Sequence, residues 1–282
     1  MNYRHAFHAG NFADVVKHAV LTLVVERLKA KPKPFCVLDT HAGIGRYDLT
    51  SDAARRTGEH AGGIGRVLHA DLPADLSPYL DAVRSLNPAD ASGGDGARWY
   101  PGSPCLVRAL MRPGDRLVLA ELHPDDAATL KREFRGDDQV AVHHMDGWLA
   151  LKAHLPPRER RGLVLIDPAF EVPDEYDRLA EGLRTGHARF PSGIFLLWHP
   201  IKERPAVWRL HDAIERSGIR DVLTVEVTIW PEDTHQRLNG CGLVIVNPPW
   251  GLEEQLARTL PGVHTAFGTG TGGVRVNRLV PE

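Results

Sequence analysis

From residue 116 onward, short apolar runs alternate with segments of helical periodicity, and this alternation limits the possible folds more than any other feature. Strand-like runs lie at residues 116–120, 140–143, 162–166, 193–198, 222–229 and 243–246. Helical patterns lie between and after them, at 124–134, 147–154, 174–183, 206–217 and 252–260. Strands that alternate with helices form a doubly wound sheet. With an earlier strand at 35–38, the sequence predicts an α/β fold with a seven-stranded, mostly parallel sheet.

Two other segments interrupt or precede this pattern. Asn11 is a typical N-cap, and apolar positions at three- and four-residue spacing predict a helix that ends before Pro32. Between residues 46 and 100 the apolar runs are short, and glycine and proline turns separate them. We interpret 46–100 as an inserted, mostly helical subdomain, and 1–45 together with 101–282 as the main domain. The glycine-rich stretch 268–273 predicts a loose tail, which a short strand can follow.

Composition excludes several classes of protein. Apolar residues make up 43% of the 282 positions and charged residues 25%, as in ordinary globular domains. The apolar runs are too short to span a bilayer, and the start of the chain lacks the apolar core of a signal peptide. The 3 cysteines are widely spaced, which suits a reducing compartment and argues against disulfides or structural zinc. We therefore expect a cytoplasmic protein with no metal site, although the chain has 15 histidines.

The charge balance gives no general signature of nucleic-acid binding. The net charge is −2, whereas proteins that bind phosphate backbones usually carry a basic excess. Any such contact must come from a local patch, and the first eighteen residues are one candidate. Their basic side chains outnumber the single acid Asp14 and are Arg4, His5, His8, Lys17 and His18. From charge alone we favour a solvated N-terminal helix, with a nucleic-acid contact as the alternative.

The most specific motif is Asp167-Pro168-Ala169-Phe170, which follows the apolar run 162–166. In open α/β sheets, ligands bind outside the carboxyl ends of the strands. There a carboxylate and the neighbouring carbonyl group can accept both hydrogens of an exocyclic amine, while an aromatic ring stacks on the base. This motif indicates methylation of an amino group on a nucleobase.

A second copy of the motif competes with the first. Asn247-Pro248-Pro249-Trp250 matches the general pattern Asn/Asp-Pro-Pro-aromatic more closely. It follows the last predicted strand, however, whereas the loop that faces a reactive cofactor should follow the fourth strand, next to the first. We interpret the second copy as the start of a helix with a packed tryptophan.

Three more loops at predicted strand ends carry suitable groups. The glycines of Asp39-Thr40-His41-Ala42-Gly43-Ile44-Gly45 allow a nucleotide-like ligand to approach the backbone. Glu121 can accept hydrogen bonds from ribose hydroxyls, and Asp146 before Gly147 can accept one from an adenine amino group. Each loop alone also fits a plain turn or a solvated acid. Together the four loops resemble those of a class I methyltransferase that uses S-adenosyl-L-methionine (SAM).

A narrower resemblance rests on the N-terminal block. Tyr3-Arg4-His5-Ala6-Phe7-His8-Ala9-Gly10-Asn11, with Lys17-His18 and Leu38-Asp39-Thr40-His41-Ala42-Gly43, closely resembles the RlmJ family of bacterial 23S ribosomal RNA adenine-N6 methyltransferases. The resemblance covers nearly the whole chain, including the insertion. It implies a Rossmann-like fold, a SAM cofactor and 23S ribosomal RNA as the substrate. We also expect a monomeric enzyme that requires no metal.

The resemblance also implies roles for individual residues. The catalytic acid would be Asp167, and the substrate would meet Tyr3, Lys17 and Phe170. The implied contacts to SAM are His18, His41, Ser103, Glu121, Asp146, Gly147 and Asp167. The family pattern is Asp-Pro-Pro-Tyr, so Ala169 and Phe170 depart from it. The change removes one proline ring and one hydroxyl but keeps a stacking face.

Three other functions share part of this pattern. A DNA adenine-N6 methyltransferase would use the same chemistry, but the sequence has no recognisable DNA-reading module. A non-catalytic module that binds SAM and RNA is supported by Ala169 and Phe170 and opposed by the retained Asp167. A nicotinamide-dependent dehydrogenase is disfavoured, because the third glycine and a nearby ribose-binding acid are absent from the first loop.

Overall fold

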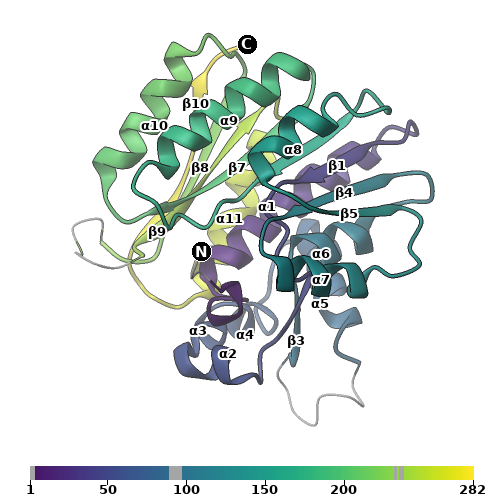
Figure 1. Cartoon of the computed structure of the whole chain (residues 1–282). Coiled ribbons are helices and arrows are strands. Elements are labelled where there is room, and N and C mark those ends of the chain that lie inside the picture. The colour runs from purple at the N-terminus through teal and green to yellow at the C-terminus, as the bar shows by residue number, and fades with distance from the viewer. Residues whose placement is uncertain (1–3, 89–96, 232–233, 235–237) are drawn as a thin grey trace.

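The computed structural model describes residues 4–88, 97–231, 234 and 238–282 and has one large sheet at its centre (Figure 1). The order of the strands across this sheet is β10-β8-β9-β7-β6-β1-β4-β5. Their bounds are β1 Cys36–Asp39, β4 Arg116–Glu121, β5 Val140–His144, β6 Gly162–Ile166, β7 Ile194–Ile201, β8 Val222–Thr228, β9 Gly240–Val246 and β10 Gly273–Val280. All seven predicted strands are present, but the predicted number was wrong, because β10 pairs with β8 as an eighth strand.

The pairing of the strands brings the predicted loops to one edge. β1 lies between β4 and β6 and is parallel to both, and β5 and β7 extend the parallel part on either side. β9 is antiparallel to β7 and β8, and β10 is antiparallel to β8. The carboxyl ends of β1, β4, β5 and β6 therefore lie side by side.

Helices cover both faces of the sheet, so the molecule has three layers (Figure 1). Alternate residues of each strand enter different cores: Val37 of β1 packs with α1, whereas Leu38 packs against α8 and α9. One face is covered by α8 Gly147–His154, α9 Glu175–Arg189 and α10 Arg204–Arg216. The other face is covered by α1 Phe12–Lys29, α5 Ser77–Ser85, α6 Ser103–Leu110, α7 Pro124–Glu133 and α11 Leu252–Ala266. In the described part of the chain, no helix is long and apolar enough to cross a membrane.

Helix α1 begins as predicted but is not solvated. The side chain of Asn11 accepts a hydrogen bond from the Asp14 amide at 2.9 Å, which caps the helix. The helix is packed between the sheet and helices α5, α6 and α11, so even Lys17 and His18 are buried. The interpretation as a solvated helix was wrong, because apolar side chains surround the helix on all sides.

The segment 46–100 starts and ends in a two-stranded ribbon. β2 Arg46–Asp48 pairs antiparallel with β3 Trp99–Pro101. Between them lie α2 Asp52–Thr57, α3 Glu59–Gly62, α4 Ile64–Val67, the 3₁₀ turn η2 Ala74–Leu76, and α5. Side chains of α4 and α5 such as Ile64 and Tyr79 belong to the same apolar core as α1. The description of this segment as a separate subdomain stays a prediction.

Candidate active site

A cavity of about 1020 Å³ lies at the carboxyl ends of the parallel strands. Its wall is formed by the loops after β1, β4, β5 and β6, by α1, and by the 3₁₀ turn η1 (His5–Phe7). The polar residues of these loops that line it include His41, Gly43, Glu121, Asp146 and Asp167. A cavity of this size can enclose a ligand as large as a nucleotide cofactor.

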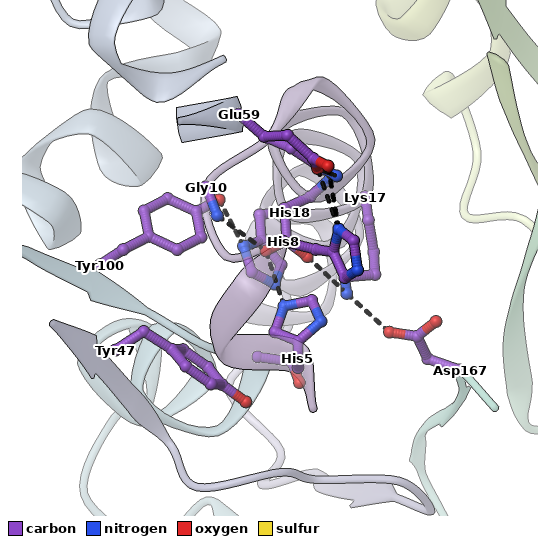
Figure 2. A network of polar contacts seen from close by, with 12 residues as sticks. His5, His8, Gly10, Lys17, His18, Tyr47, Glu59, Tyr100 and Asp167 are labelled. Carbon is purple, nitrogen blue, oxygen red and sulfur yellow. Dashed lines mark hydrogen bonds and ion pairs between the residues drawn. The ribbon is translucent and has the colours of Figure 1, made fainter. Parts of the chain in front are cut away.

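Lys17 of α1 lines this cavity and forms ion pairs with two carboxylates. Figure 2 shows its contact with one of them, Asp167. Its Nζ lies 2.6 Å from Asp167 Oδ2 and 2.8 Å from Asp14 Oδ1. The residue is 5% exposed. Burial acts to lower the pKa of Lys17, but the two negative charges outweigh it and hold that pKa well above its usual value. Lys17 is therefore a fixed positive charge beside Asp167.

Asp14 is the buried partner that fixes Lys17 in place. Its Oδ2 accepts hydrogen bonds from the Gly10 amide at 3.0 Å and from His5 Nε2 at 2.8 Å. Burial acts to raise the pKa of Asp14, yet the charges of His5 and Lys17 keep it well below the usual value. The Asp14 carboxylate thus connects the N-terminal turn to the ion pair at Asp167.

Glu121 joins the loop after β1 to the loop after β4. Its Oε2 accepts a hydrogen bond from the Gly43 amide at 2.8 Å, and its Oε1 accepts one from the His123 amide at 2.7 Å. Gly43 has a φ of +63°, and a Cβ there would lie 2.3 Å from the Tyr47 hydroxyl oxygen. The close turn therefore requires glycine. Each carboxylate oxygen of Glu121 keeps a further lone pair for a ligand.

Asp146 and Gly147 bring the start of α8 against the loop after β1. Asp146 Oδ1 accepts hydrogen bonds from the amides of Trp148 at 2.7 Å and Leu149 at 3.1 Å, so this oxygen caps the helix. A Cβ on Gly147 would lie 2.1 Å from the carbonyl oxygen of Thr40. The absence of a side chain at Gly147 lets the two loops share one wall of the cavity.

Two lining residues, His18 and Ser103, are each paired with a buried polar group behind the wall. His18 Nδ1 lies 2.8 Å from the Tyr100 hydroxyl, and its Nε2 has no hydrogen-bond partner among the described residues. Burial lowers the pKa of His18 to about 3, so the ring is neutral. Ser103 Oγ donates to Asp39 Oδ2 at 2.6 Å. Burial raises the pKa of Asp39 to about 6.

Comparisons with known proteins agree on one family. The sequence profile of the family described as "Ribosomal RNA large subunit methyltransferase D, RlmJ" matches residues 32–280. Curated relatives named "Ribosomal RNA large subunit methyltransferase J" are 44% identical in Escherichia coli and 42% identical in Haemophilus influenzae. Each alignment covers 100% of both chains. The chain belongs to this RlmJ family of ribosomal RNA methyltransferases.

A solved structure shares the whole fold of this RlmJ family member. A Legionella pneumophila protein of known crystal structure superimposes with a TM-score of 0.87 at 31% sequence identity. The match covers 96% of this chain and 98% of that chain. The two proteins therefore have the same fold over nearly the full length of both chains.

The cavity of this RlmJ family member contains nearly all of the predicted site residues. Those that line it are Lys17, His18, His41, Ser103, Glu121, Asp146, Gly147, Asp167 and Phe170. Tyr3 lies outside the described residues, so the structure says nothing of its predicted contact with substrate. Among the residues described, no group of three or more His, Cys, Asp or Glu side chains is arranged to hold a metal ion. The individual roles stay predictions.

The two copies of the Pro-aromatic motif lie at opposite ends of the strands. Asp167 follows β6, whereas Asn247 follows β9, which runs in the opposite direction to β7. The Asn247 side chain donates to the carbonyl oxygens of Pro191 and Gly193, at 2.8 and 2.7 Å. The second copy does precede a helix, as predicted, but Trp250 is 91% exposed, so the prediction of a packed tryptophan was wrong.

Sequence reasoning gave no role to Asp14, Asp39 or Tyr100. Asp14 could have been found, because it lies three residues before Lys17 on a helix, where opposite charges meet. Tyr100 is 82 residues away from His18, and no local pattern connects them. Asp39 was noted only as the first residue of the glycine-containing loop.

Proposed function

We propose that this protein transfers a methyl group from SAM to the exocyclic N6 amino group of an adenine in 23S ribosomal RNA. The observation that carries the proposal is the position of Asp167 and Phe170 in the cavity wall, beside the loop that follows β1. Membership of the ribosomal RNA methyltransferase family supports the same substrate class. We propose that the protein acts as a monomer.

The wall of the cavity fits SAM. Glu121 has spare lone pairs for ribose hydroxyls, and Asp146 keeps one oxygen, Oδ2, outside the helix cap. Nε2 of His18 has no hydrogen-bond partner in the described part of the chain, and a polar ligand would provide one. The residues that would hold the cofactor are His18, His41, Ser103, Glu121, Asp146, Gly147 and Asp167. When bound, SAM supplies a methyl group on a positively charged sulfur.

Asp167 and Pro168 would prepare the amino group of the adenine. The lone pair of this nitrogen is delocalised into the ring, so the free base is a poor nucleophile. The Asp167 carboxylate and the Pro168 carbonyl can each accept one amino hydrogen and favour a tetrahedral nitrogen. Lys17 occupies Asp167 Oδ2, and Oδ1 has no partner among the described residues. Orientation of this kind supplies up to roughly 7–11 kcal/mol of the barrier.

The charge beside the nitrogen also matters. A positive charge develops on the amine as the methyl group is transferred, and a fixed carboxylate stabilises it. Lys17 holds the carboxylate in position through its 2.6 Å contact. Asp167 need not be a strong base, because a methylated, positively charged aromatic amine readily loses its proton.

Phe170 would hold the plane of the base. Stacking of a base on an aromatic ring is worth roughly 1–3 kcal/mol. A target inside a duplex must first be unpaired and unstacked, so a loop or partly unfolded RNA is the better substrate. Three N-terminal basic residues also line the cavity: Arg4, His5 and His8.

Labelled SAM tests the proposal directly. The protein is incubated with naked 23S RNA, assembled ribosomal subunits or DNA, and the modified nucleoside is identified. We expect N6-methyladenosine in RNA. Methylation of DNA alone would support the DNA methyltransferase instead, and binding of SAM and RNA without product would support a non-catalytic module.

The second copy of the motif, at Asn247, provides a control for a substitution at Asp167. Asp167→Ala is expected to abolish transfer and to retain most SAM affinity in isothermal titration calorimetry. Asn247→Ala changes the second copy of the motif and should leave transfer by the folded protein intact, with folding checked by thermal melting. Near wild-type transfer by Asp167→Ala would refute the assignment.

A further inference from the structure

A buried chain of hydrogen bonds connects the insertion to the cavity. The hydroxyl groups of Tyr79 and Tyr100 lie 3.0 Å apart, and the Tyr100 hydroxyl lies 2.8 Å from His18 Nδ1. Tyr79 belongs to α5, Tyr100 to β3 and His18 to α1, and all three are 0% exposed. Figure 2 shows Tyr100 beside His18. His18 lines the cavity, and its Nε2 lacks a partner among the described residues.

All three groups are neutral at neutral pH. Burial raises the pKa of Tyr79 and of Tyr100 well above the usual value. It lowers the pKa of His18 to about 3. Each group therefore carries one polar hydrogen, either on a hydroxyl oxygen or on one of the two ring nitrogens.

Because each group carries one polar hydrogen, the hydrogen bonds from Tyr79 through Tyr100 to His18 can run in two directions, which differ in the donors that they leave unbonded. If Tyr79 donates to Tyr100 and Tyr100 donates to His18 Nδ1, both hydroxyl hydrogens are bonded and the ring hydrogen is on Nε2. In the reverse direction the Tyr79 hydroxyl hydrogen has no acceptor among the described residues. The first direction leaves only the Nε2–H of His18 unbonded, and His18 lines the cavity, where water or a ligand can accept this hydrogen. The reverse direction leaves an unbonded donor on Tyr79, which does not line the cavity, and this is costly, so the first direction is favoured.

We propose that Tyr100, which accepts a hydrogen bond from Tyr79, is a positioning residue that keeps the hydrogen of the His18 ring on Nε2, which makes this ring a hydrogen-bond donor toward the cavity. The identity of the ligand rests on the proposed function. The amino-acid end of SAM has a carboxylate, which accepts hydrogen bonds, and an ammonium group, which donates them. A donor at His18 selects the carboxylate. The segment 46–100 thereby contributes to cofactor binding through the Tyr100 hydroxyl.

Nuclear magnetic resonance tests the direction of these hydrogen bonds in the free protein, without ligand or turnover. The ring nitrogens of His18 in ¹⁵N-labelled protein are expected to show a protonated Nε2 and an unprotonated, hydrogen-bonded Nδ1. In Tyr100→Phe the Nδ1 resonance should shift, because its donor is lost. In Tyr79→Phe the ring should keep the same tautomer, since Tyr100 can still donate to it. A protonated Nδ1 in the wild-type protein, or a change of tautomer in Tyr79→Phe, would overturn the proposal whatever the function of the protein.

Calorimetry with two ligands tests whether the SAM carboxylate accepts the hydrogen bond from His18. Tyr100→Phe is expected to weaken SAM binding about tenfold, because the ring is no longer held with its hydrogen on Nε2. Decarboxylated SAM, which lacks the acceptor, should lose less than about twofold. Thr259→Val removes a buried hydroxyl of α11 that does not line the cavity, and it should change neither affinity. Equal losses for the two ligands would refute the carboxylate assignment. A wild-type protein that binds neither ligand would contradict the proposed function and leave the tautomer result standing.

Discussion

Lys17→Met should destabilise the protein through the buried carboxylate that it leaves behind. Lys17 is 5% exposed and Asp14 is 3% exposed, and their charged atoms lie 2.8 Å apart. Removal of one member of a buried ion pair costs about 3–5 kcal/mol, because the remaining charge is neither solvated nor paired. The side chain of Asp167 is 17% exposed and can gain water, so most of this loss should come from Asp14.

A double-mutant cycle separates this cost from lost packing. Asp14→Asn alone leaves Lys17 paired with Asp167 and disturbs the hydrogen bonds from Gly10 and His5, so we expect a loss of about 1–3 kcal/mol. In the double variant Asp14→Asn/Lys17→Met no charge is left at position 14. Its loss should therefore be smaller than the sum of the single losses, with a coupling of about 1–3 kcal/mol.

Urea denaturation of the four proteins measures the coupling. The exposed pair Arg258 and Asp75 provides the matched control, since its charged atoms lie 3.1 Å apart but the arginine side chain is 59% exposed. Its own cycle, with Arg258→Met and Asp75→Asn, should give a coupling below about 1 kcal/mol. Losses at Asp14 and Lys17 that add within about 0.5 kcal/mol would refute the claim that this pair acts as a buried unit.

Three other outcomes follow from the structure. Lowering the pH from 7.5 to 5 should reduce the free energy of unfolding by about 5 kcal/mol. The reason is that three histidines with lowered pKa values stay neutral in the folded protein, whereas in the unfolded protein they take up protons below about pH 6.5. The pKa is about 3 for His18 and about 4 for His41 and His199, so each contributes about 2 kcal/mol, and Asp39, with its raised pKa of about 6, offsets about 1. A flat stability profile in urea denaturation across this pH range would contradict this. Gly147→Ala places a methyl group 2.1 Å from the Thr40 carbonyl oxygen and should weaken SAM binding at least about tenfold, as calorimetry can measure. Unchanged affinity would show that the loops after β1 and β5 separate easily. Phe170→Ala should lower kcat/KM on RNA about tenfold through lost stacking while SAM affinity stays constant, and an unchanged kcat/KM would exclude the ring from base binding.

The loops of the site could be predicted because their signals are local. An apolar run followed by a polar or glycine-containing turn marks the end of a strand, and parallel strands direct these turns to the same edge. Glu121, Asp146 and Asp167 lie in one cavity for this reason. The choice of Asp167 over Asn247 likewise depended on the order of the strands, which the pairing of β1 with β6 confirms.

The burial of α1 and the pairing of β10 into the sheet could not be predicted with the same reasoning. The basic side chains of α1 indicated a surface, but Asp14 and Asp167 neutralise Lys17 inside the protein. Only packing in three dimensions decides between these outcomes. After the glycine-rich stretch 268–273 a short strand was expected, and Val274 and Val276 alternate with polar residues as in a strand with one buried face. No local signal showed that this strand pairs with β8.

The departure from the family motif affects the residues that would stack on the adenine more than it affects the proposed catalytic carboxylate of Asp167. Asp167 and Pro168 are retained, so both acceptors for the amino hydrogens are present in this chain. Ala169 removes the rigidity of a second proline, but Phe170 is held edge-to-face against Tyr176 and Trp198, with ring centroids 4.9 and 5.8 Å away. Phe170 also has a φ of +51°, a strained conformation for an aromatic residue that surrounding contacts must maintain. Packing of the ring can therefore replace the stiffness of the missing proline, and the stacking face stays available beside the carboxylate that Lys17 holds.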